Sequence, residues 1–215
     1  MMHPQYQEWI SYVFDHPGDS CEWDSMDEFP GTPTDHAILI HETFSRSGTD
    51  LQCFTDAQVN QGLYFLVSPT GSNHMLAFRD ENVPLPIKIQ GIQSIATLYR
   101  ECFAKRCTEV LGHLDEKGAS DLNAICYMFW DVCVLSYLDP CPNHKQDMED
   151  AVLSVLRDTI HIPHRACIEG GLHGLGEICF GEDRANEILE ELLATKNLDP
   201  DLKRYAENAR DEYVL

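Results

Sequence analysis

Three histidines lie close together between residues 161 and 173, and the imidazole nitrogen is a common zinc ligand. His161 and His164 are three residues apart, a spacing that places two side chains on one face of a helix. Ile162-Pro163 falls between them, so one helix does not present both. The alternative is that they form a turn or a cap. With His173, they are the first set of candidate metal ligands.

A second pair with ligand spacing is Cys141-Pro142-Asn143-His144. A structural zinc site usually needs four ligands in two pairs, and Cys133 and His161 could complete the set only if the fold brings them to this pair. The alternative, which we favour, is a proline-rich loop between two helices. Cys141 and His144 remain candidate metal ligands, and we predict no cofactor.

Cysteine chemistry is the third possibility, because a nucleophilic thiolate needs a base and an orienting group beside it. Cys167 could use His164 or His173 as its base, and it lies in the first turn of an expected helix, where the helix dipole can lower a thiol pKa. The alternative is a small buried side chain. The sequence contains no Walker loop, Rossmann glycine fingerprint or nucleophile elbow, so we assign no catalytic residue.

The elements that must position these residues show the apolar spacing that is typical of helices. Thr55-Asp56-Ala57-Gln58 is a capping box, and Asp199-Pro200 is an N-cap followed by a helix-starting proline. No segment alternates between apolar and polar residues for long enough to predict a strand. The sequence therefore predicts an all-α protein, with helices over residues 4–16, 35–44, 55–67, 74–79, 86–103, 120–138, 148–160, 163–178, 185–193 and 199–209.

Helix starts recur along the chain with a period near 40 residues. Pro163 to Pro200 spans 37 residues, and Pro86 to Pro163 spans 77, or about two such steps. This period is typical of HEAT and armadillo arrays, which have two helices in each short repeat.

Residues 163–176, PHRACIEGGLHGLG, resemble the second helix of a HEAT repeat. They share its Pro-led turn, its early arginine and its many small residues. The resemblance covers residues 55–212 and implies a HEAT-like superhelix of antiparallel helical pairs. The chain as a whole also resembles a bacterial all-helical family for which no activity is known.

The glycines at 170, 171, 174 and 176 each oppose helix formation by about 1 kcal/mol relative to alanine. Close approach of a neighbouring helix backbone would offset this cost, so we expect one there. The alternative is that the segment is a loop.

The chain has 36 acidic and 15 basic residues among 215, a formal net charge of −21. Nucleic-acid binding and docking on an anionic membrane both need clustered Lys and Arg, so we expect neither partner. The first basic residue is Arg46, and neither a signal nor a transit peptide pattern is present. The most apolar run, residues 122–138, is short and polar for a membrane span. We expect a cytoplasmic protein with reduced cysteines.

We expect an acidic N-terminal segment, residues 1–54, that packs on a HEAT-like repeat domain, residues 55–215. Such arrays present extended surfaces that bind other proteins. The first functional hypothesis is a non-enzymatic binding or scaffold protein whose acidic surface engages a basic protein. One version is an immunity-type inhibitor of a basic toxin. The second hypothesis is a metal-binding protein or a cysteine/histidine enzyme that uses residues 161–173.

Overall fold

The computed structural model of this chain describes residues 2–17, 28–138, 143–178 and 180–210. Every regular element in these ranges is a helix, which confirms the predicted all-α class. None of the described helices is both long and apolar enough to cross a lipid bilayer.

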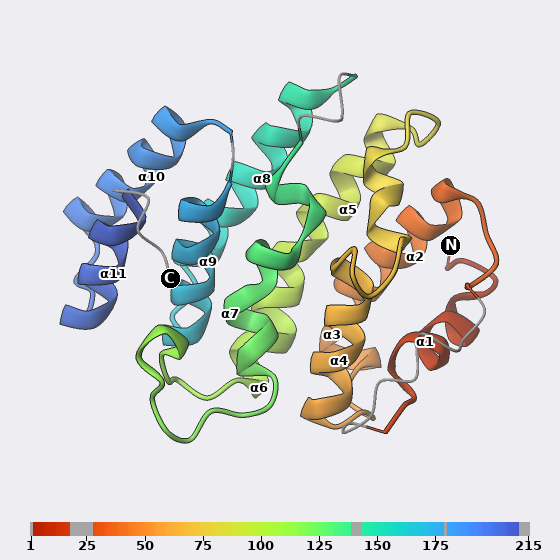
Figure 1. Cartoon of the computed structure of the whole chain (residues 1–215), viewed down its shortest axis with the longest axis horizontal. Coiled ribbons are helices and arrows are strands. Elements are labelled where there is room, and N and C mark those ends of the chain that lie inside the picture. The colour runs from red at the N-terminus through yellow and green to blue at the C-terminus, as the bar shows by residue number, and fades with distance from the viewer. Residues whose placement is uncertain (1, 18–27, 139–142, 179, 211–215) are drawn as a thin grey trace.

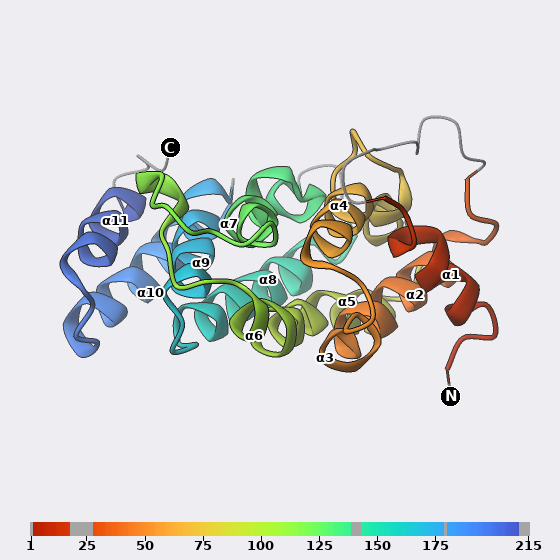
Figure 2. The ribbon, with the colours of Figure 1, turned by 90° about the horizontal axis from the view of Figure 1, so that it is seen from below.

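The long helices form two layers, seen edge-on in Figure 2. The first layer contains α2 (Pro33–Ser45), α5 (Leu85–Leu98), α8 (Lys145–Ile160) and α10 (Glu182–Thr195). The second layer contains α4 (Asp56–Val67), α7 (Asn123–Val132), α9 (Arg165–Glu177) and α11 (Pro200–Arg210), with α1 (Tyr6–Phe14) packed on α4. From α2 to α11, successive long helices alternate between the two layers, and neighbours within a layer lie side by side (Figure 1).

Short elements connect the long helices. They are α3 (Ser47–Asp50), the 3₁₀ turn η2 (His74–Arg79), the π-helical turn η3 (Tyr99–Phe103), α6 (Ala104–Arg106), and the 3₁₀ turns η4 (Gly112–Leu114) and η5 (Val134–Ser136). One continuous apolar core runs between the layers, and Trp9, Tyr99 and Trp130 are among its largest fully buried side chains.

Both predicted helix starts are confirmed. The Thr55 hydroxyl accepts a hydrogen bond from the Gln58 backbone at 3.2 Å, and the Gln58 side chain accepts one from the Thr55 backbone at 3.0 Å. At the start of α11, the Asp199 carboxylate accepts a hydrogen bond from the Leu202 backbone at 3.1 Å. These side chains satisfy N–H groups that have no partner within the helix.

The predicted helix over residues 120–138 is shorter than expected. Helix α7 ends at Val132, because Cys133 adopts an extended backbone conformation. The carbonyl groups of Val134 and Tyr137 instead accept hydrogen bonds from the guanidinium of Arg79, the last residue of η2. A side chain from a distant part of the chain therefore holds the segment that follows this helix.

The glycine-rich segment is helical, so the loop alternative is wrong. A Cβ atom at Gly170 would overlap the carbonyl oxygen of Cys126 on α7, and one at Gly174 would overlap the Trp130 ring. The expected close approach of a neighbouring helix is confirmed. The absence of these side chains lets α9 contact α7 backbone to backbone, which offsets the helix cost of glycine.

Candidate functional site

Helices α7 and α9 place polar side chains opposite one another along their contact. Residues four apart share one face of a helix, and each helix carries three polar residues at this spacing. We call this set the α7–α9 polar row: Asn123, Tyr127 and Asp131 on α7, with Glu169, His173 and Glu177 on α9.

Glu169 fixes the loop that covers one end of the row. Its carboxylate is buried and accepts hydrogen bonds from the Gly112 backbone (2.9 Å), the His113 backbone (3.0 Å) and the His113 ring Nδ1–H (2.6 Å). A buried carboxylate requires such donors, because an unsatisfied charge away from water is costly. Glu169 therefore holds the loop, and its oxygens are engaged.

Tyr205 of α11 connects this loop to the middle of the row. Its ring stacks on His113 with the centroids 4.1 Å apart, and its hydroxyl lies 2.8 Å from His173 Nδ1 and 3.1 Å from the Tyr127 hydroxyl. Burial raises the pKa of Tyr205, so its phenol keeps its proton at neutral pH. These contacts fix the orientation of the His173 ring.

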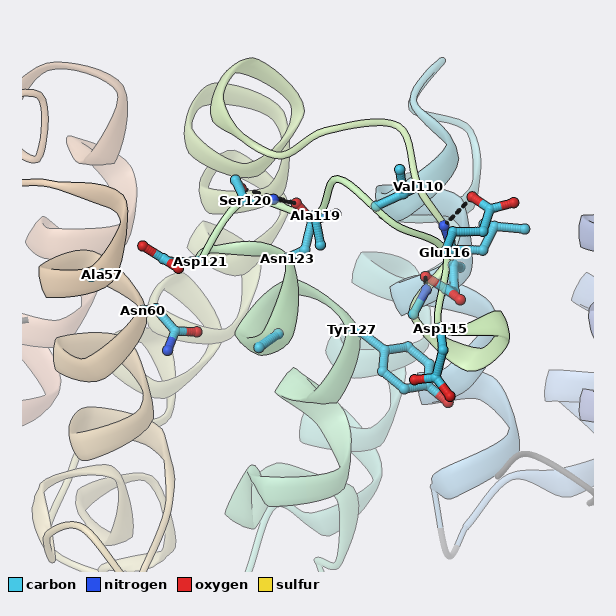
Figure 3. A pocket seen from close by; sticks show the side chains of 14 residues that line it. Ala57, Asn60, Val110, Asp115, Glu116, Ala119, Ser120, Asp121, Asn123 and Tyr127 are labelled. Carbon is cyan, nitrogen blue, oxygen red and sulfur yellow. Dashed lines mark hydrogen bonds between the residues drawn. The ribbon is translucent and has the colours of Figure 1, made fainter. Parts of the chain in front are cut away.

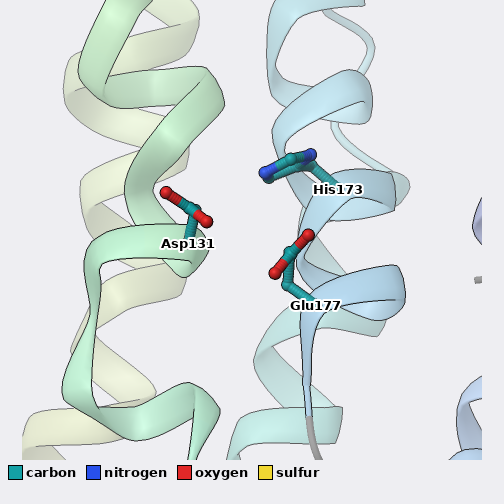
Figure 4. Close-up of side chains that lie close together, drawn as sticks. All are labelled: Asp131, His173 and Glu177. Atoms are coloured by element: carbon teal, nitrogen blue, oxygen red, sulfur yellow. The ribbon is translucent and has the colours of Figure 1, made fainter. Parts of the chain in front are cut away.

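At the other end of the row, Asp131, His173 and Glu177 converge (Figure 4). One ligand-type atom from each lies within 4.8 Å of the other two. Burial lowers the pKa of His173, which keeps its imidazole neutral at pH 7, while burial and the nearby Asp131 raise the pKa of Glu177. Asp131 is exposed and Glu177 is half-buried, so this end of the row opens to solvent.

A pocket of about 910 Å³ adjoins the covered end of the row, between α4, α7 and the loop before α7 (Figure 3). Its wall is fixed by Asn123, whose side-chain oxygen accepts hydrogen bonds from the Thr108 and Ser120 backbones. Asp115 and Asp121 are exposed at its rim. Neither forms an ion pair within the described ranges.

The structure does not bring the predicted histidines together. His161 is exposed at the end of α8, where its Nδ1–H donates to the Arg157 carbonyl at 2.7 Å. His164 directly precedes α9 and its Nε2–H donates to the Cys107 carbonyl at 3.1 Å. Both positions match the turn or capping alternative. Only His173 belongs to a group of three possible metal ligands in the part of the chain that the structure describes.

His144 of the second predicted pair belongs to no such group among the described residues. His144 directly precedes α8, is exposed, and lies 3.8 Å from the Asp147 carboxylate. Cys141 lies outside the described residues.

Cys167 is fully buried. Its thiol lies 3.8 Å from the Tyr99 carbonyl, and the neighbouring Cys126 thiol lies 3.6 Å from the Ala166 carbonyl. Hydrogen bonding with Cys126, and then with His164, lowers the pKa of Cys167. A fully buried thiol cannot meet a substrate without movement of the surrounding helices, so this geometry fits the buried-side-chain alternative.

Sequence reasoning missed Asp131 and Glu177. Two signals could have found them: Asp131 interrupts the most apolar run of the chain, and Glu177 follows His173 by four residues. No family model, curated protein or solved structure matches this chain.

Proposed function

We propose that this chain is a non-enzymatic, HEAT-like helical array that binds a basic protein through an acidic face. The two layers of alternating helices support the HEAT-like assignment, as does the close contact of α7 and α9 through glycine. In solenoids of this type, stacked helical pairs present long surfaces to partner proteins.

The observation that carries the proposal is an unpaired acidic stripe on α10. Asp183, Glu187 and Glu190 are exposed and spaced four and three residues apart, so they project from one side of the helix. None forms an ion pair with another described residue. Like charges at this spacing destabilise a helix by a few tenths of a kcal/mol, and a cationic partner would remove that cost.

The stripe continues onto α8, the neighbouring helix of the first layer. Arg184 pairs with Asp150, and Arg157 pairs with Glu191 at 3.8 Å, so the exposed sides of the two helices adjoin. An additional exposed carboxylate on α8 extends the negative surface. We call this surface the α8–α10 acidic face: Asp147, Asp183, Glu187 and Glu190.

A negative face of this kind accelerates encounter with a basic partner and disfavours acidic ones. Salt screens exposed charges over about 10 Å at 0.1 M ionic strength, so the association must weaken as salt rises. An immunity-type inhibitor of a basic toxin is one function that requires such fast and selective binding.

The test compares two triple variants with the same change in net charge. The first neutralises the stripe (Asp183→Asn, Glu187→Gln, Glu190→Gln). The control neutralises three exposed carboxylates at the N-terminal end (Glu8→Gln, Asp15→Asn, Glu81→Gln).

Each protein is immobilised and exposed to a lysate of its source at about 0.05 M and about 0.5 M KCl, and the bound proteins are identified by mass spectrometry. The proposal predicts that the unmodified chain captures one basic protein in a one-to-one ratio at low salt. The control variant should capture the same protein, and the stripe variant should not. Equal capture by both variants, or capture independent of salt, would contradict it.

The alternative function, metal or cysteine/histidine chemistry over residues 161–173, receives uneven support. The burial of Cys167 and the capping positions of His161 and His164 do not favour it. His173 is the exception, because it faces two carboxylates.

A further inference from the structure

The solvent-open end of the α7–α9 polar row contains a mixed set of donor atoms. Asp131 and Glu177 supply carboxylate oxygens, and His173 supplies an imidazole nitrogen, all within 4.8 Å of one another. Two of the three come from one helix at a spacing of four residues, and the third comes from the facing helix (Figure 4). Because α7 and α9 touch at Gly170 and Gly174, this arrangement sits on a rigid support.

His173 supplies the observation that points to a ligand. Its side chain is 3% exposed, and its Nε2 has no hydrogen-bond partner among the described residues. Its Nδ1 lies 2.8 Å from the Tyr205 hydroxyl. In the tautomer with the proton on Nδ1, that hydroxyl accepts the hydrogen bond and the Nε2 lone pair points toward the two carboxylates. Nε2 is thus a buried ring nitrogen that no described residue satisfies, and a cation beside the two carboxylates would satisfy its lone pair.

We propose that Asp131, His173 and Glu177 bind one divalent first-row transition-metal ion between α7 and α9. The two carboxylates balance the charge of the ion, and the imidazole supplies its nitrogen ligand.

The donor set selects the class of ion. Imidazole favours zinc, iron and related ions, whereas carboxylates also suit manganese, so two oxygens and one nitrogen fit Mn²⁺, Fe²⁺ or Zn²⁺ better than Ca²⁺ or Mg²⁺. Ligands bind such ions at about 2.0–2.2 Å. The exposed Asp131 carboxylate can rotate to close the remaining distance, and its exposure leaves further coordination positions to water.

Tyr205 completes the site as a positioning residue. A metal-bound histidine usually donates its second ring N–H to a neighbouring oxygen, which fixes the ring and its tautomer. The Tyr205 hydroxyl occupies that position and is itself held by the Tyr127 hydroxyl. Loss of such a partner typically weakens metal affinity about 10- to 100-fold.

The test uses Mn²⁺ as the probe, because the electron paramagnetic resonance signal of free Mn²⁺ measures binding directly. The chelator-treated protein should bind one Mn²⁺ per chain, and Zn²⁺ should displace it while Mg²⁺ and Ca²⁺ do not. Asp131→Asn and Glu177→Gln should each weaken binding at least tenfold, as expected when a direct ligand is removed. Asp121→Asn, at an exposed carboxylate two residues before α7, is the matched control and should bind normally.

Electron spin-echo modulation supplies a second readout. The bound Mn²⁺ should show coupling to one imidazole nitrogen, and His173→Gln should abolish it. If His173→Gln does not fold, the exposed Asp131→Asn variant still decides the question. Absence of Mn²⁺ binding, equal competition by Mg²⁺, or unchanged affinity in Asp131→Asn would overturn the proposal.

Discussion

Acidification should destabilise the protein through His74, which is buried among aromatic rings. Its side chain is 1% exposed, and neither ring nitrogen has a hydrogen-bond partner among the described residues. Trp9 and His36 pack edge-to-face on it with centroids 4.9 and 4.7 Å away. Burial, followed by the nearby His36, lowers the pKa of His74 from 6.5 to about 3.

The direction in which stability changes with pH follows from proton uptake by the unfolded chain. Between pH 6.5 and pH 3 the unfolded chain binds a proton at this position and the native state does not, so stability falls as the pH falls. Each pKa unit corresponds to about 1.4 kcal/mol, so His74 should lower the free energy of unfolding by about 2 kcal/mol at pH 5 relative to pH 7.

His74→Phe should remove this contribution, because phenylalanine keeps an aromatic ring and does not titrate. The assay is urea unfolding followed by tryptophan fluorescence at several pH values from about 7 to 5, in the presence of a chelator. The loss of stability over this range should be about 2 kcal/mol smaller in His74→Phe than in the wild type. His161→Gln, at an exposed histidine, is the control and should follow the wild type. An unchanged pH dependence in His74→Phe would refute the reasoning.

Three further outcomes are expected. Gly170→Ala should destabilise the protein by about 1–3 kcal/mol in urea, because its Cβ would overlap a backbone oxygen of α7; a more stable protein would contradict the packing. Cys167 should resist iodoacetamide in the native protein despite its lowered pKa, and its modification without unfolding, seen by peptide mass spectrometry, would show that it is accessible. The hydrogen bond from the Leu111 backbone, and then Arg165, lower the pKa of Glu116, so stability from this carboxylate is present above pH 4.5 and lost below it. Arg165→Met should therefore lower stability near pH 7 and by less near pH 3.5, and a constant difference in urea unfolding would contradict this.

The helices could be predicted because their signals are local. Apolar spacing and the caps at Thr55 and Asp199 act over a few residues, and they gave correct elements. The end of α7 could not be predicted in this way. The backbone after this helix is held by Arg79, which binds the carbonyl groups of Val134 and Tyr137 from a different part of the chain.

In the candidate site, too, the local features could be predicted and the long-range contacts could not. His173 was a candidate from the sequence, but with His161 and His164 as its expected neighbours. Pro163 separates those two from α9, and the residue that faces His173 is Asp131, on a helix 42 residues earlier. Spacing along one helix predicts which side chains share a face, whereas the partner helix is set by packing across the layer.

Zero-length cross-linking of the captured complex tests the central claim most directly. A carbodiimide joins carboxylates to lysine amines that are already in contact, so it reports which acids of this chain touch the basic partner. The α8–α10 acidic face predicts cross-links from Asp183, Glu187 or Glu190, which disappear at high salt. Cross-links confined to carboxylates of the N-terminal helices α1 and α2 would contradict the account.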